Sequence, residues 1–343
     1  MTKNSLHIVL FVLLFLLALF LFFLDISFGS VTIPQNEILK SLTGGTSSKS
    51  TWDYIVLNYR LPKAITAILV GMGLSISGLL MQTLFRNPLA GPYVLGLSSG
   101  SSLAVALVIL GSSYLPPIWN NIFVSSYGII LASCLGSSAV LLAVLFVSQR
   151  LRDTMAILIV GLMFGSFTSA FVGVLAYFSS AEQLQKFTFW SMGNLGNLSW
   201  DSILILTIAV SIGLAISLAS IKPLNTLLLG ENYARSLGMN YEKSKLLIII
   251  ATSILAGSIT AFAGPIAFIG LAVPHVAKLL FHTSNHRVLF WATLLIGSSL
   301  MLLCDLISQM PGSDFTLPIN AITSIIGAPV VIWLLVRKRK MMC

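Results

Sequence analysis

Long apolar runs, separated by short polar segments, dominate the pattern of this chain. The first run, Ile8 to Leu24, contains 17 consecutive apolar positions, which span roughly 26 Å as a helix at about 1.5 Å per residue. It predicts a transmembrane helix. A cleaved signal peptide is the alternative, but its apolar core is usually shorter, and no small-x-small cleavage site follows Leu24.

Similar apolar runs recur along the whole sequence, and they predict an all-α, polytopic membrane protein with about ten transmembrane helices. We expect one transmembrane domain over residues 1–343. A Gly-Pro break at Pro265 separates two of the runs. The alternative at this point is that the two runs form one long helix. The nine further runs lie at 64–84, 93–110, 122–147, 154–178, 202–221, 246–263, 265–281, 288–308 and 318–336.

The composition narrows the class of protein. Only 8% of the residues are charged, 57% are hydrophobic and the mean hydropathy is +0.98, whereas about 25% of a typical soluble domain is charged. One soluble core of this size could not bury so much apolar surface. Water-soluble enzymes, nucleic-acid binders and disordered proteins are therefore excluded.

The distribution of basic residues predicts the orientation. With both termini in the cytoplasm and ten spans, 14 of the 19 basic residues lie inside and 5 outside, as the positive-inside rule favours. The outer five are Lys40, Lys49, Arg60, Lys63 and Lys186.

The sequence contains no residue set that indicates catalysis, so we expect no enzyme activity. It has no HExxH, GxSxG or Walker A motif. The three cysteines and four histidines show no metal-ligand spacing, so we expect no metal site. Charged residues are rare inside the predicted spans, which disfavours a proton-coupled carrier.

Three sequence blocks carry more specific information. The first is Arg60-Leu-Pro-Lys63 followed by residues 71–104, which include RNPLAGP; the second is LLLGENYARSLGMN at 227–240. The third is GPIAFIGLAVPH at 264–275, with LPINAITSIIGAP at 317–329. Together they resemble the FecCD-type permease subunits of ABC importers for iron-siderophores, haem and vitamin B12.

This resemblance implies an importer with several partners. It implies a second permease subunit, which we expect to make a homodimer, two cytoplasmic ABC ATPase subunits, an external or periplasmic solute-binding protein and a metal-chelate cargo. ATP and Mg²⁺ would be bound by the ATPases, and no cofactor by this chain. The bacterial cytoplasmic (inner) membrane is the implied location.

The polar segment 222–245 predicts short helices in a long cytoplasmic loop. Residues Glu231, Ala234, Arg235 and Gly238 have the i, i+3, i+4, i+7 spacing of one helix face, and Gly238 would end the helix as a left-handed cap. A solvated loop helix is the simpler interpretation. The resemblance instead implies a coupling helix that binds the ATPase, formed by Gly230, Glu231, Ala234, Arg235, Leu237 and Gly238.

Arg60 and Lys63 precede the second predicted span. Basic residues here could simply place their charges at the membrane interface. The resemblance implies that both pair with acidic residues of the binding protein. A further basic residue that the family sometimes has late in the ninth span is Gln309 here, which suggests docking with fewer charges.

Other motif residues have an ordinary structural interpretation beside the implied one. Arg86, Asn87 and Pro88 predict a turn with a charged anchor. Thr154 aligns with the inner mouth of the implied pathway. Trp190 and Gly193 resemble a family segment below the binding protein, although an interfacial Trp anchor explains Trp190 equally well.

The GPIAFIGLAVPH block contains the last set of motif residues. Gly264, Pro265, Gly270, Pro274 and His275 belong to it. His275 could ligate haem or a metal, but a structural capping role is the better interpretation because the Pro-His pair belongs to the family block whatever the cargo.

The sequence thus favours a permease that moves a ferric siderophore inward by alternating access. A haem or cobalamin importer is the first alternative. Two alternatives come from other classes: a carrier driven by an ion gradient, which needs no ATPase, and a membrane scaffold that transports nothing.

Overall fold

The computed structural model describes residues 3–45, 47–114, 123–150, 154–196, 198–309 and 316–340. All regular secondary structure in these ranges is helical. Contacts divide the chain into two compact units, which we describe separately. Helices α4 (Leu61–Leu84) and α10 (Trp200–Ala219) each contribute residues to both units. The expectation of a single domain stays a prediction.

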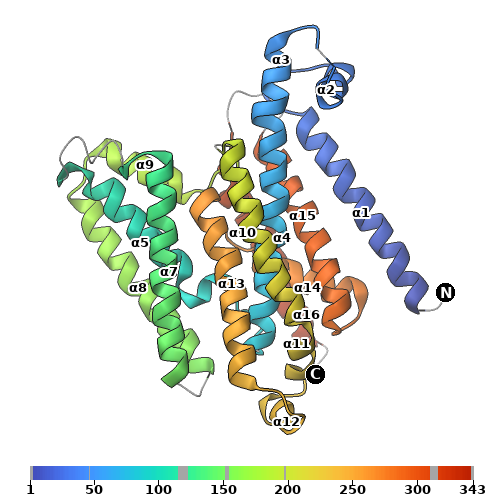
Figure 1. Ribbon diagram of the computed structural model, residues 1–343, viewed down its shortest axis with the longest axis vertical. Coiled ribbons are helices and arrows are strands. Elements are labelled where there is room, and N and C mark those ends of the chain that lie inside the picture. Colours follow the sequence, from blue (N-terminus) through green and yellow to red (C-terminus); the bar gives the residue numbers. More distant parts are fainter. Residues whose placement is uncertain are drawn as a thin grey trace. The chain divides into compact units, whose positions relative to one another are not determined.

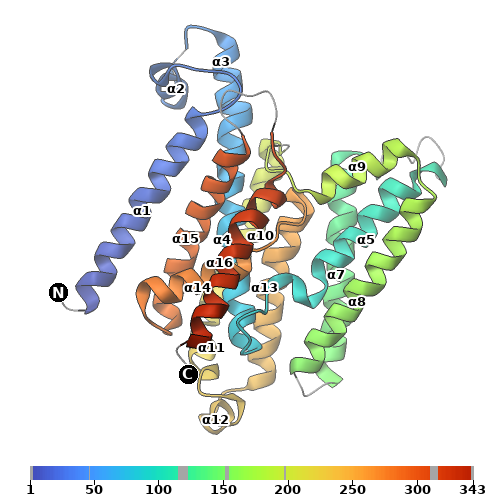
Figure 2. The same cartoon turned by 180° about the vertical axis from the view of Figure 1, so that it is seen from behind.

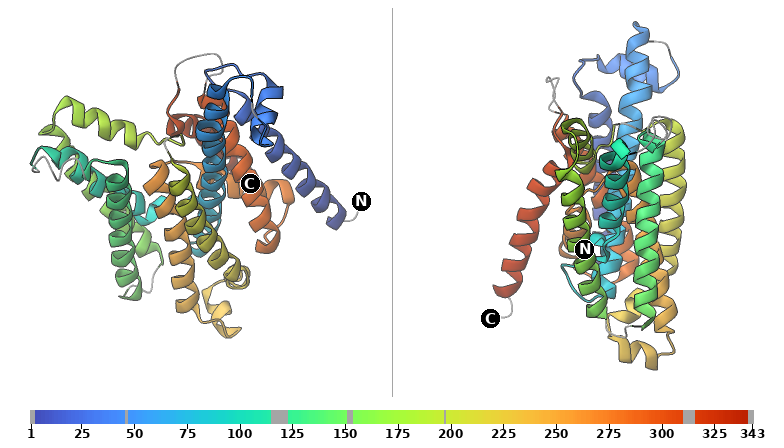
Figure 3. Two further views of the ribbon diagram at one scale, coloured as in Figure 1. Left: turned by 45° about the horizontal axis from the view of Figure 1, so that its top comes forward. Right: turned by 90° about the vertical axis from the view of Figure 1, so that its left-hand side faces the viewer.

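The first unit comprises residues 1–76, 194–208 and 266–343. Its spans α14, α15 and α16 pack against one another, and α1 runs along α15 (Figure 2). Two short helices, α2 and α3, follow α1 and precede α4 (Figure 3). Its helices are α1 (Lys3–Ser27), α2 (Gln35–Leu42), α3 (Ser50–Ile55), a π-helical turn η1 (Val56–Arg60), the first part of α4, α14 (Ile269–Phe281), α15 (His286–Ser308) and α16 (Ile319–Lys340).

The second unit comprises residues 77–193 and 209–265. Its centre is α5, which packs against α7, α8, α9 and α13 (Figure 1). Its elements are η2 (Pro92–Leu95), α5 (Leu97–Ile109), η3 (Leu110–Tyr114), α7 (Ser126–Arg150), α8 (Thr154–Tyr177), α9 (Ala181–Ser191), α11 (Ile221–Leu227), α12 (Glu231–Ser236) and α13 (Tyr241–Ala263), with parts of α4 and α10.

The helices agree with the apolar pattern of the sequence. Among the described residues, seven helices are long and apolar enough to cross a membrane, and three shorter apolar helices accompany them at Leu97–Ser112, Ile269–Phe281 and Ile319–Trp333. Each of the ten predicted segments coincides with one of these helices, which confirms the all-α polytopic fold. The chain also breaks near Pro265, so α13 and α14 are separate helices.

The second span begins earlier than the sequence predicts. The helix runs without interruption from Ser50 through the π-helical turn to Leu84, so Arg60 and Lys63 lie within it. The expectation that they precede the span is wrong. Both charged side chains have hydrogen-bond or ion-pair partners inside the first unit. Their low hydropathy therefore does not mark a helix end.

Small residues allow two spans of the first unit to approach closely. A Cβ atom added to Gly71 of α4 would overlap the backbone carbonyl of Gly297 of α15, and one added to Gly297 would overlap Ser75. Such contacts replace the hydrophobic effect as the source of helix association in lipid. These residues therefore have a packing role.

Candidate functional site

The loop between α10 and α13 contains the helix that the sequence marks as functional. Gly230 lies at the N-cap of α12 with φ +103°, and Gly238 follows the helix with φ +82°. The amide of Gly238 donates to the Arg235 carbonyl and the amide of Met239 to the Ala234 carbonyl, at 3.0 and 3.1 Å. This is a Schellman motif, which needs the left-handed residue. The predicted cap at Gly238 is confirmed.

Charged side chains of α12 form a network on the surface of the second unit. The Arg235 guanidinium donates to Glu231 Oε1, with Nη2 at 2.8 Å and Nε at 3.1 Å, and to Glu242 Oε1 at 3.3 Å. The hydrogen bonds that Arg235 donates to Glu231 raise the pKa of Arg235 above its usual value. The guanidinium carbon of Arg235, Cζ, also lies 4.9 Å from the centroid of the Tyr241 ring. The pairs fix the shape of an exposed helix and leave charge on its surface.

The predicted single face of α12 is only partly correct. Ala234 is completely buried, whereas Glu231 and Arg235 point outward. The amphipathic helix therefore anchors through Ala234 and presents its charged side chains to solvent.

Apolar residues in this loop are exposed as well. Leu229, Tyr233 and Leu237 have 60%, 58% and 60% of their surface accessible. Leu237 is one of the predicted coupling residues, whereas Leu229 and Tyr233 are not. Exposed apolar residues beside charged ones are typical of a protein-binding surface, and the i, i+4 spacing of Tyr233 and Leu237 could have revealed the pair.

The turn formed by Arg86, Asn87 and Pro88 lies next to this loop in the second unit. The Asn87 carboxamide oxygen accepts from the Leu89 amide at 2.9 Å, and Arg86 has φ +48°. A Cβ atom added to Gly230 would lie 3.4 Å from Arg86 Nη1. The predicted turn is therefore confirmed, and its charged anchor reaches the start of α12.

Arg60 is buried in the first unit. Its guanidinium donates to the carbonyl oxygens of Ile26 at 3.0 Å and Ser27 at 2.9 Å, and also to that of Val31. These carbonyls belong to the last turn of α1 and the segment after it, where a helix leaves acceptors unsatisfied. Arg60 thus caps α1. Its predicted docking role stays a prediction, and these contacts favour a structural role.

Lys63 belongs to a buried polar cluster in the same unit. Lys63 Nζ lies 3.0 Å from Asp305 Oδ1, and Asp305 is completely buried. The Gln309 amide donates to Asp25 Oδ1 at 2.8 Å and to Asp305 Oδ2 at 3.2 Å. We call Asp25, Lys63, Asp305 and Gln309 the Asp305 cluster. It joins α1, α4 and α15, and sequence spacing alone could not have shown it.

Gln309 has a specific place in this cluster. Its amide nitrogen donates to two carboxylates at once. An amide carries no charge, so among the described residues Lys63 alone forms an ion pair with Asp305. The docking role of Lys63 is untested, and its ion pair must break or stretch for that role.

The segment after α9 meets the end of α13 in the second unit. A Cβ atom added to Gly264 would lie 2.7 Å from the Trp190 carbonyl oxygen and 3.0 Å from Gly193 Cα. The Trp190 ring stacks on Phe187, with ring centroids 6.1 Å apart, and packs on a buried cluster that includes Val105 and Ile109. Trp190 and Gly193 therefore have packing contacts, and their pathway role stays a prediction.

The GPIAFIGLAVPH block continues from this contact into the first unit. Phe268, at the N-cap of α14, has φ +66°, and the Ala267 amide donates to Asn320 Oδ1 at 3.0 Å. The block is thus tied to the LPINAITSIIGAP segment. Gly270 and Pro274 are buried in α14, and His275 follows Pro274 there.

Thr154 is the first residue of α8, and its side chain lies outside the described residues, as do its contacts. Within the described ranges, no three His, Cys, Asp or Glu side chains are grouped so that they could hold a metal ion.

The long apolar helices define an all-helical, multi-pass membrane protein. The chain belongs to the FecCD transport family, which it matches over residues 16–337. This is a family of ABC transporter permease subunits, so the chain is a permease whose family works with ATPase partners and a second permease subunit.

Two curated relatives show how similar the chain is to characterised proteins. It is 34% identical over 316 residues to the hemin transport system permease protein HmuU of Yersinia pestis, covering 92% of this chain and 93% of HmuU. It is also 34% identical over 325 residues to the vitamin B12 import system permease protein BtuC of Klebsiella pneumoniae, covering 94% and 92%.

A solved structure has a similar fold over nearly the full length. It is an inward-facing conformation of a transporter assigned to the metal-chelate type of ABC transporters. The TM-score is 0.82 at 28% sequence identity, and the match covers 96% of this chain and 99% of that one. The fold of this chain is therefore that of an ABC permease.

Proposed function

We propose that this permease moves a ferric siderophore into the cytoplasm, driven by partner ATPases. The observation that carries the proposal is the α12 region, where an anchored helix presents Glu231, Arg235, Tyr233 and Leu237 outward. A permease needs such a surface to receive the motion of an ATPase. A nucleotide-driven movement of α12 would be passed to the spans as rigid bodies.

The identity of the cargo is a separate part of the proposal. The relatives named for hemin and for vitamin B12 share the same 34% identity with this chain, so their similarity does not distinguish the two cargoes. A chelate enters with its metal already coordinated, so the proposal requires no metal ligands from the permease. Haem and cobalamin are the alternative cargoes.

We further propose that both termini and α12 lie in the cytoplasm of a bacterial inner membrane. The support is the excess of basic residues on that side of the chain. On the opposite side a solute-binding protein delivers the cargo to a homodimer of this chain. Arg60 and Lys63 are candidates for docking, although their present partners are internal.

Coupling can be tested by changing only the exposed apolar residues of α12. The double substitution Tyr233→Ser and Leu237→Ser removes two side chains that support no buried core. If both lie at the centre of the ATPase interface, affinity should fall by about tenfold or more. Purified permease and ATPase are compared by a direct binding measurement, such as biolayer interferometry.

A matched control comes from α2 and α3, which lie in the first unit. Leu39→Ser with Tyr54→Ser also removes one exposed leucine and one exposed tyrosine, 47% and 59% accessible. This variant should bind the ATPase normally. Equal losses in both double variants would contradict a specific α12 interface.

Transport itself is measured in proteoliposomes that contain the permease, its ATPase and its binding protein. Uptake of labelled ferric siderophore should need ATP and should collapse in Glu231→Arg, which reverses the charge next to Arg235. Uptake without ATP would instead support an ion-driven carrier. Uptake of haem or cobalamin, but of no siderophore, would correct the cargo; no uptake of any cargo would support a scaffold.

A further inference from the structure

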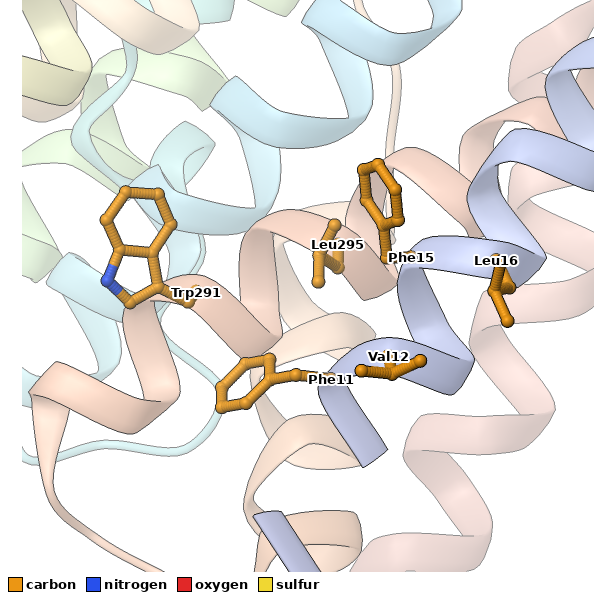
Figure 4. Close-up of a pocket in the computed structure, with 6 residues that line it drawn as sticks. All are labelled: Phe11, Val12, Phe15, Leu16, Trp291 and Leu295. Atoms are coloured by element: carbon orange, nitrogen blue, oxygen red, sulfur yellow. The ribbon is translucent and has the colours of Figure 1, made fainter. Parts of the chain in front are cut away.

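An open apolar groove lies between α1 and α15 in the first unit. It has a volume of about 440 Å³, and the close-up in Figure 4 shows its lining side chains projecting from the two helices. Half or more of the surface of Val12, Phe15 and Trp291 is accessible. The lining residues are Phe11, Val12, Phe15, Leu16, Trp291 and Leu295.

The groove has a fixed wall at one end. His7 Nε2 lies 3.1 Å from the Phe281 carbonyl oxygen, and the ring of Phe11 lies 4.8 Å from that of Phe281, centroid to centroid. These contacts tie α1 to the end of α14. The separation of α1 and α15 is thereby set by the protein itself.

A cation lies on the same face of α15 as the groove. Arg287, Trp291 and Leu295 follow one another at four-residue intervals, so they form one line along the helix. Arg287 is exposed, and within the described residues no acidic side chain forms an ion pair with it. From Arg287 to Leu295 the helix rises about 12 Å.

These dimensions match one leaflet of a bilayer. The hydrocarbon core is about 30 Å thick, so one leaflet contributes about 15 Å. Tryptophan is enriched at the headgroup level, where Trp291 would lie if Arg287 contacts the headgroup. Basic residues between membrane helices on the cytoplasmic side are a known form of headgroup site.

We propose that the groove binds an anionic phospholipid, with an acyl chain along Phe15 and Leu295 and the phosphate at Arg287. A membrane helix is a poorer occupant. The apolar surface of a helix would leave the Arg287 guanidinium without a negative charge, whereas a lipid phosphate would pair with it.

The test measures lipid retention by the purified, delipidated full-length chain, without any partner. Native mass spectrometry compares added phosphatidylglycerol with phosphatidylcholine that has the same acyl chains. The parent should retain phosphatidylglycerol preferentially. Arg287→Gln should weaken that retention about fivefold and remove the preference, while phosphatidylcholine binding stays unchanged.

Leu295→Trp fills the groove and should lower the retention of both lipids. Two matched controls should behave as the parent: Lys222→Gln removes another exposed cation, and Ile325→Trp enlarges an exposed apolar residue outside the groove. Thermal unfolding confirms that every variant is folded.

Three results would overturn the proposal. The first is equal retention of the two lipids by the parent. The second is an equal loss of phosphatidylglycerol retention in Arg287→Gln and Lys222→Gln. The third is a change in the oligomeric state of Leu295→Trp with no change in its lipid content. Because no ATPase or cargo is present, these results are independent of the transport assay.

Discussion

The Asp305 cluster and the α12 region both concentrate charged residues, but they use them in opposite ways. In the cluster, Lys63 and Asp305 face each other in the interior of the first unit. On α12, Glu231 and Arg235 pair at the surface beside exposed apolar side chains. Buried pairs are costly to break, whereas exposed pairs contribute little to stability. The comparison separates charges that hold the fold from charges that are free to meet a partner.

The largest effect is expected when the buried pair is broken. Lys63→Ala leaves the fully buried Asp305 carboxylate without its cation and should lower the free energy of unfolding by about 3–5 kcal/mol. Thermal unfolding in detergent measures this. Lys186→Ala is the control, because it breaks an exposed pair with Glu182 and should change stability by less than about 0.5 kcal/mol.

The same substitution separates the two interpretations of Lys63. If Lys63→Ala unfolds like the parent and only loses affinity for the binding protein, the docking role is correct and the structural one is wrong. Lys63→Arg keeps the charge, so it provides a folded comparison if the alanine variant cannot be purified.

Close helix packing gives the next largest effect. In Gly71→Ala the new methyl group meets the Gly297 backbone, which cannot rotate away, so we expect a loss of about 1–3 kcal/mol. Gly173→Ala in α8 meets no atom within 4 Å and should be neutral or stabilising by about 0.5–1 kcal/mol. Opposite signs in unfolding experiments would confirm the packing role; equal effects would contradict it.

A smaller effect on stability is expected at the surface pair. Arg235→Ala should change the free energy of unfolding by less than about 0.5 kcal/mol, because its ion pairs are exposed. Its affinity for the ATPase should nevertheless fall by about fivefold or more, as expected for an arginine in an interface. Lys222→Ala is the control, and a stability loss in Arg235→Ala equal to that in Lys63→Ala would remove the distinction between the two regions.

The smallest effect concerns a local pH dependence in the loop after α1. Glu37 accepts hydrogen bonds from Lys40 Nζ at 2.8 Å and from the Ser48 amide at 2.6 Å, which lower its pKa from 4.5 to about 2. Its stabilising effect is therefore complete above pH 4.5 and is lost as the pH falls to about 2. Hydrogen exchange at the Ser48 amide measures this.

Glu37→Gln supplies the control for that experiment. The amide cannot titrate, so protection of the Ser48 amide should be weaker than in the parent at neutral pH and should not change between pH 4.5 and 2. The same pH dependence in both proteins would show that Glu37 is not the group responsible.

Local features of the fold could be predicted from the sequence. The ten apolar runs gave the helices because a membrane span needs a continuous apolar segment. The cap at Gly238 was predictable because a Schellman motif involves only neighbouring residues. The turn at Asn87 and Pro88 is local for the same reason.

Long-range polar contacts could not be predicted in this way. Asp25 and Gln309 are 284 residues apart in the sequence, and no periodicity connects them. An isolated charge beside an apolar run is typical of the end of a span, so the sequence places Arg60 and Lys63 at the membrane interface. The burial of Ala234 likewise follows from tertiary packing, although the i, i+4 spacing of Tyr233 and Leu237 beside it is visible in the sequence.

The Arg60 contact with α1 also constrains the order in which the chain matures during synthesis. Arg60, which donates to the Ile26 carbonyl, comes 34 residues after Ile26 in the chain. At a synthesis rate of about 5–20 residues per second, the first span therefore emerges some two to seven seconds before its cap. In that interval the last turn of α1 must find water or another temporary donor, since hydrocarbon offers none. The end of α1 therefore reaches its final hydrogen bonding only when the second span, which contains Arg60, has been made.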